Sequence, residues 1–137
     1  MADLIITPGN VIAGANAIKA AGAAGETITA GQPVARDSVT RKFLKADNNA
    51  PNADLRTPVG IALHGASLDQ PLTIQTEGDI NLGAALTVGV PYFLGDAPGG
   101  ISPLADLTSG EFVSSLGIAS SASNLKLKIN VSGAAVP

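Results

Sequence analysis

The sequence predicts an all-β protein, either a small antiparallel β-barrel or a β-tulip-like sandwich, with an extended N-terminal arm and long loops. Strand-like runs recur about every 10–15 residues with Gly, Pro, Asn or Asp between them, which is typical of all-β domains. Segment 125–131 alternates aliphatic residues with Lys and Asn, which predicts a strand with one buried face and one face exposed to solvent. Two stretches with helical composition, 14–24 and 105–112, are too short or too rich in glycine to serve as the crossover helices of a parallel sheet.

The remaining elements follow from local alternation and turn chemistry. Strands are predicted over residues 26–29, 33–36, 41–46, 59–64, 72–76, 91–94, 112–119 and 125–131. The Ala-Gly pair at 30–31 predicts a tight turn between the first two. Segment 47–58 is dense in Asn, Asp and Pro and predicts one long surface loop, which either carries contacts or forms an insertion-tolerant tip.

One predicted strand carries few large side chains on one of its two faces. In segment 59–64 the larger apolar residues share one side, while Gly60, Ala62 and His64 share the other. Such a face lets another backbone approach closely. The approaching backbone belongs either to a partner subunit or to the same chain.

The composition of this 137-residue chain favours assembly over an isolated monomer. Hydrophobic residues make up 45% but aromatic residues only 3%, and charged residues are 14% against about 25% in ordinary domains. Small side chains bury little area each, which predicts a thin core and a surface suited to partners. The absence of cysteine and the single histidine exclude zinc ribbons, iron–sulfur clusters and disulfide scaffolds. A net charge of −3 argues against nucleic acid as a partner.

The domain organisation expected is an N-terminal arm over residues 1–24, a β domain over 25–132 and a C-terminal tail over 133–137. Both ends are rich in Ala and Gly with weak patterning, so they are expected to order only against a partner. The start of the chain lacks the basic region of a signal peptide. Segment 11–25 is too short and too weakly hydrophobic to span a membrane, so no membrane partner is expected.

Residues suited to catalysis are few. His64 is the single imidazole, and no Gly-x-Ser-x-Gly nucleophile motif accompanies it. Glu77 and Asp79 form a possible acid pair, but Glu-Gly-Asp between two strand-like runs is more typical of a hydrated turn. We therefore predict no catalytic, cofactor-binding or metal-binding residues.

The charges are distributed unevenly along the chain. Segment 36–45 carries four basic residues against one acid, whereas segment 77–111 carries five acids and no base. Opposite patches of this kind either meet across a subunit interface, where they set register and partner choice, or are solvated faces.

Five short segments together resemble the capsid decoration (cement) proteins of tailed bacteriophages. They are GETITAGQPV at 25–34, PVGIALHGA at 58–66, VPYFLG at 90–95, PGGI at 98–101 and LGIA at 116–119. The resemblance covers about residues 25–131, and residues before Gly25 match no motif of the family. It implies a small β-barrel or tulip-like domain that sits as a homotrimer on the outside of the virion capsid and joins neighbouring major capsid proteins. The family has no catalytic residues.

The function expected is therefore structural rather than enzymatic, in a protein made in the host cytoplasm and placed on the capsid surface. One alternative is a phage tail or fibre module that contacts a host receptor, and another is a small hydrolase or carbohydrate-binding domain using His64 or the Glu77–Asp79 pair. Deletion of residues 1–14 is expected to abolish capsid binding and leave the β domain folded. The residues expected at interfaces are Leu4, Ile5, Ile6, Val11, Ile12, Arg41, Lys42, Gly60 and Ala62.

Overall fold

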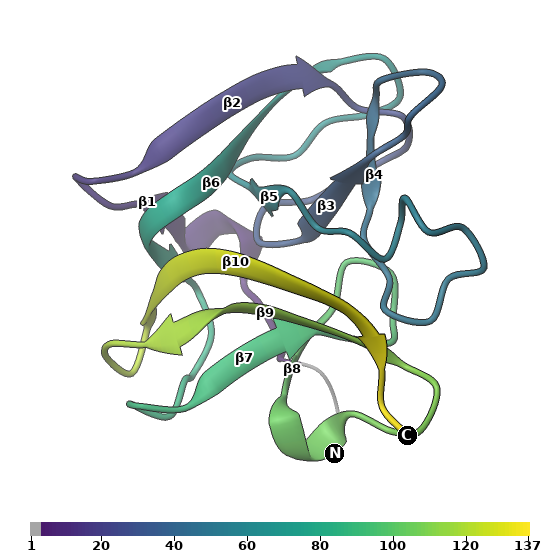
Figure 1. Cartoon of the computed structure of the whole chain (residues 1–137). Coiled ribbons are helices and arrows are strands. Elements are labelled where there is room, and N and C mark those ends of the chain that lie inside the picture. Colours follow the sequence, from purple (N-terminus) through teal and green to yellow (C-terminus); the bar gives the residue numbers. More distant parts are fainter. Residues whose placement is uncertain (1–3) are drawn as a thin grey trace.

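The computed structural model describes residues 4–137 and confirms the all-β class. Its strand pairs are all antiparallel and form one curled, half-barrel sheet (Figure 1). The strands are β1 (Val11–Ala13), β2 (Ile18–Ala23), β3 (Pro33–Arg36), β4 (Phe43–Lys45), β5 (Gly60–Ala62), β6 (Pro71–Leu82), β7 (Pro91–Leu94), β8 (Ile101–Pro103), β9 (Phe112–Ala119) and β10 (Asn124–Ala135). Two short 3-10 helices, η1 (Pro8–Asn10) and η2 (Leu104–Asp106), complete the elements of the described residues.

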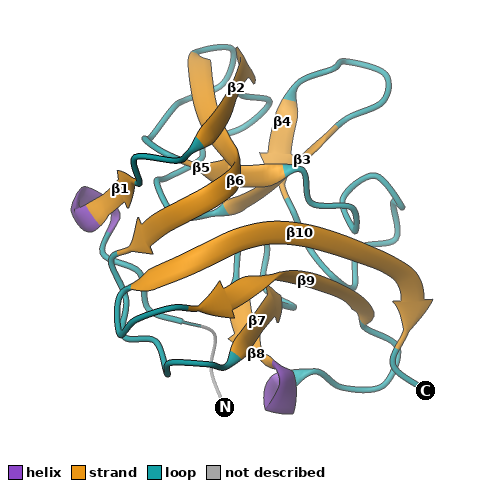
Figure 2. Ribbon diagram, turned by 60° about the vertical axis from the view of Figure 1, so that its left-hand side comes forward, coloured by secondary structure: helices purple, strands orange, loops and turns teal. Residues whose placement is uncertain are grey.

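Strand β6 joins two lobes of the sheet. Its first half pairs with β2 and β5, and β5 leads on to β3 and β4. Its second half pairs with β1 and β10, and β10 leads on to β9, β7 and β8. Figure 2 shows β6 and the long, curved β10 side by side where the lobes meet.

The change of partners along β6 occurs at Gly78. Its φ of +100° is a conformation that favours glycine, and a Cβ there would lie 2.5 Å from the backbone oxygen of Asn16. The buried Gln75 amide bridges this irregularity by donating to the carbonyls of Glu77 (3.2 Å) and Asp79 (2.9 Å). The interpretation of segment 77–79 as a hydrated turn is therefore wrong, because these residues form the middle of β6.

Each lobe has its own apolar core. In the lobe of β10, the side chains of Leu125 and Leu127 are buried while those of Lys126 and Lys128 are exposed, as the alternation predicts. This core also holds Ile80, Leu82, Ile101 and Leu116. The core of the other lobe is built from Ile28, Val34, Phe43, Leu72 and Ile74.

The predicted N-terminal arm and C-terminal tail are largely part of the sheet. Residues 11–23 contain β1 and β2, which pair with β6, and Val11 and Ala24 are buried. Pairing with β6 satisfies the backbone hydrogen-bonding groups of this Ala- and Gly-rich segment. Its side chains alone do not indicate a strand. At the other end, β10 continues to Ala135, which pairs with Phe112. The sheet thus extends beyond both expected boundaries, at 24 and at 132. Residues 1–3 of the expected arm lie outside the described part of the chain.

The face of segment 59–64 that carries few large side chains is covered by the same chain. A Cβ at Gly60 would lie 2.6 Å from the carbonyl oxygen of Gln75 on β6. Gly60 and Ala62 are both buried, so their assignment to a subunit interface is wrong. The close approach is between β5 and β6.

Segment 47–58 is a loop, as predicted. Asn48 is fully buried and anchors it, since its Nδ2 donates to the carbonyl of Leu94 (2.9 Å) and its own carbonyl accepts from the N–H of Phe112 (2.9 Å). Further along the loop, the Asp54 carboxylate accepts a hydrogen bond from the backbone N–H of Ser38 (3.0 Å).

We expect the link between Asp54 and Ser38 to respond to acid. Hydrogen bonds from the Ser38 side chain and backbone lower the pKa of Asp54 below its ordinary value of 3.8. Because the folded pKa is depressed, the link is intact above pH 3.8 and is lost as the pH falls through the folded pKa. The NMR shift of the Ser38 amide should titrate with a midpoint below 3.8 and should stop titrating in Asp54→Asn. A midpoint at or above that value would contradict the assignment.

Candidate functional site

The apolar residues predicted at interfaces near the N-terminus separate into two groups. Leu4 and Ile6 are partly buried against the core of the β10 lobe, and Val11 is buried within it. Ile5 and Ile12 point the other way, with exposed fractions of 88% and 61%. Only these two are free to contact a partner.

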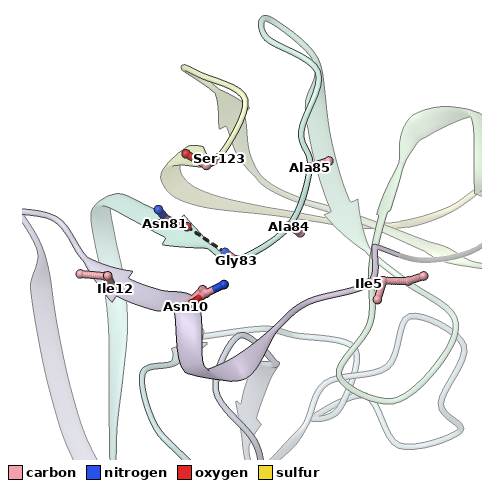
Figure 3. A pocket seen from close by; sticks show the side chains of 8 residues that line it. All are labelled: Ile5, Asn10, Ile12, Asn81, Gly83, Ala84, Ala85 and Ser123. Atoms are coloured by element: carbon pink, nitrogen blue, oxygen red, sulfur yellow. Dashed lines mark hydrogen bonds between the residues drawn. The ribbon is translucent and has the colours of Figure 1, made fainter.

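Ile5 and Ile12 border opposite ends of one open hollow of about 450 Å³, which we call the N-terminal hollow, and their side chains point away from each other (Figure 3). Its other lining residues come from η1, from the end of β6 with the following turn, and from the turn before β10. They are Asn10, Asn81, Gly83, Ala84, Ala85 and Ser123.

Gly83 sets the shape of this hollow. Its φ is +63°, and a Cβ there would lie 2.5 Å from the carbonyl oxygen of Thr7. Its N–H donates to the Asn81 side chain (2.9 Å), and its carbonyl accepts from the N–H of Thr7 (3.0 Å). The extended segment that carries Ile5 is thus held against the end of β6, and a second bond, from the N–H of Leu4 to the carbonyl of Ile101 (2.8 Å), fixes its start.

The chemistry of the N-terminal hollow suits a protein surface. All eight lining residues are uncharged, two of them are exposed isoleucines and three are Gly or Ala. Large apolar side chains with few charges are typical of the centre of a protein–protein interface, and side-chain amides such as those of Asn10 and Asn81 supply hydrogen bonds there. The sequence does not mark the small residues or Ser123 as lining residues of a binding surface, because Gly-Ala-Ala after a strand indicates only a turn.

The predicted basic cluster lies in the other lobe, away from the N-terminal hollow, and is largely engaged within the chain. Lys42 forms an ion pair with Asp69, and Lys45 lies 3.8 Å from Glu26. The Arg36 guanidinium stacks over the ring of Phe43 at 4.6 Å. Arg41 is exposed in the turn between β3 and β4, with φ +64°.

His64 has a structural position. Its Nε2 accepts from the backbone N–H of Thr73 (3.1 Å), and its Nδ1 donates to the carbonyl of Gly65 (2.9 Å). Nε2 therefore joins the segment after β5 to β6, while the Nδ1 bond lies within that segment. Within residues 4–137, no group of three or more His, Asp or Glu side chains is placed to hold a metal ion, and no helix is long and apolar enough to cross a membrane.

Comparison of the chain with models of protein families, with curated proteins and with solved structures gives no match.

Proposed function

We propose that the chain is a structural virion protein, a capsid decoration protein of a tailed bacteriophage that binds the outer capsid surface as a homotrimer. In this role it joins neighbouring major capsid proteins and performs no catalysis. The observation that carries the proposal is the pair of exposed isoleucines on the uncharged N-terminal hollow. Side chains of this kind are buried only when the surface is covered by a partner.

The energetics of such a contact fit a capsid lattice. Burying one isoleucine side chain stabilises a complex by about 1.5–3 kcal/mol. The contribution of one copy is modest, but a protein that binds only the assembled shell stabilises that shell by mass action, and many copies on one lattice add their effects.

Deletion of residues 1–14 would remove the buried Val11 and all of β1, so it would disturb folding as well as binding. Point variants at the exposed residues separate binding from folding. We expect the double variant Ile5→Asp/Ile12→Asp to bind capsids stripped of the protein about 100-fold or more weakly, since two buried isoleucines are lost. Its urea midpoint should stay near that of the wild type. Binding is measured by cosedimentation with the capsids.

The matched control is Val39→Asp/Leu68→Asp, which changes two residues that are 87% and 59% exposed and lie outside the N-terminal hollow. Its capsid affinity should equal that of the wild type. Full binding by Ile5→Asp/Ile12→Asp would refute the assigned surface. Saturable binding of the wild type to host cells, without binding to capsids, would establish the tail or fibre module instead.

A further inference from the structure

The outer face of the sheet around β6 and β10 carries its charges in columns. Its residues alternate along the strands with the buried side chains of the core. The isoleucines, the lysines and Glu77 are exposed to solvent, whereas Asp79 and Pro91 are half-buried and Oδ1 of Asp79 is covered. We call this surface the striped face, and it consists of Ile18, Glu77, Asp79, Lys126, Lys128, Ile118 and Pro91.

Strand register fixes the order of the columns. On β6 and β10, Glu77 lies opposite Lys128 and Asp79 lies opposite Lys126. On the far side of β6, Ile18 lies opposite Glu77, and on the far side of β10, Ile118 lies opposite Lys126. From β2 across β6 and β10 to β9, the columns are therefore apolar, acidic, basic and apolar.

The two flanking isoleucines are equally exposed, at 54% each. Beside Ile118, the surface is hollowed by about 610 Å³ between Pro91, Lys128 and Ile129. The hollow arises where the ladders of β9 with β7 and with β10 both shift register near Leu116. Among residues 4–137, neither Lys126 nor Lys128 forms an ion pair.

This pattern is complementary to itself under one rotation. A two-fold axis that runs parallel to β6 and β10, between them and just above the sheet, exchanges the two halves of the face. The acidic column of one copy then meets the basic column of the other, and Ile18 meets the hollow beside Ile118. A two-fold axis across the strands would instead place acids on acids.

We infer that the striped face binds a second copy of this chain in an isologous contact, with Glu77 and Asp79 of each copy facing Lys128 and Lys126 of the other. Complementary charges select this register over others, and the apolar flanks supply the burial. The inference goes beyond the proposed capsid role, because a two-fold contact differs from the three-fold contacts of a trimer. On a lattice it would connect neighbouring trimers.

Charge reversal tests this contact. The variants Glu77→Lys/Asp79→Lys and Lys126→Glu/Lys128→Glu each place like charges across the two-fold axis. In sedimentation equilibrium the wild type should have twice the mass of either variant alone, and an equimolar mixture of the two variants should recover the wild-type mass. Repulsion inside one chain is not relieved by mixing, so recovery identifies a contact between chains. If the proposed trimer also forms, each trimer presents three striped faces, so the wild type should then have at least twice the mass of either variant.

A second pair of variants leaves the charges intact in case the reversed chains do not fold. Ile18→Asp should halve the mass, whereas Val88→Asp, at a residue that is 62% exposed and outside the striped face, should not. Wild-type mass for Ile18→Asp and for both charge variants would overturn the inference. Failure of the mixture to recover, with each variant folded, would also overturn it.

Discussion

Replacing Gly78 with alanine is expected to lower the free energy of unfolding by about 4 kcal/mol, through backbone strain together with a steric clash. The new Cβ would lie 2.5 Å from the backbone oxygen of Asn16 and 3.0 Å from the Cα of Ala17, and backbone cannot rotate away as a side chain can. Because β6 contributes to both lobes, the displacement disturbs the pairing of β2, β5 and β10 together. Urea unfolding followed by circular dichroism measures the loss.

Gly110→Ala is the matched control. Its φ of +89° imposes similar strain, but nothing lies within 4 Å of the Cβ position. It should lose about 1–2 kcal/mol. Equal losses for the two variants would show that the approach of segment 16–17 to Gly78 does not constrain the fold.

Phe43→Ala is expected to cost about 3–5 kcal/mol, because the ring is fully buried and the cavity left behind cannot collapse completely. The ring packs against Gly22 of β2, where a Cβ would meet it at 2.7 Å, and it supports the guanidinium of Arg36. Against a total stability of about 5–15 kcal/mol for a typical domain, this is a large fraction. The effect is measured by thermal unfolding at fixed protein concentration.

Val39→Ala serves as the comparison, since this side chain is 87% exposed and its loss should change stability by less than about 0.5 kcal/mol. A small effect of Phe43→Ala would mean that the lobe of β2 to β5 contributes little to stability. In that case the thin core predicted from the composition would reside almost entirely around β10.

Strands with a clear local signal were predicted closely from the sequence. The bounds of β7 and β9 match the predicted segments 91–94 and 112–119, and the inward and outward residues of β10 are correct through Lys128. In β10, large apolar side chains mark the core face at every second residue, whereas β7 and β9 are apolar runs bounded by turn-forming residues.

The N-terminal strands could not be predicted in the same way. Segment 18–23 reads Ile-Lys-Ala-Ala-Gly-Ala and has only one large apolar residue, which points outward. What makes it a strand is the edge of β6, 48 to 59 residues away in the sequence. Propensity and periodicity do not contain that information, so the segment resembles a weak helix or an arm.

Glycine caused the other errors for a related reason. In the sequence, Gly78 resembles a turn residue and Gly60 resembles a site where a partner approaches. A missing side chain indicates that another segment comes close, but it does not identify that segment. In both cases the approaching backbone is intramolecular. For the N-terminal hollow, the alternation of residues 4–6 and 11–12 determines which isoleucines face solvent, and only the fold brings Ile5 and Ile12 to one surface.

The most direct test of the central claim is electron cryomicroscopy of phage capsids stripped of the protein, after addition of either the wild type or Ile5→Asp/Ile12→Asp. The account predicts trimeric density on the outer capsid surface with the wild type, with the N-terminal hollow turned toward the major capsid protein. The double variant should leave the same positions empty. Bare capsids with the wild type, or wild-type density only on the tail, would contradict the account.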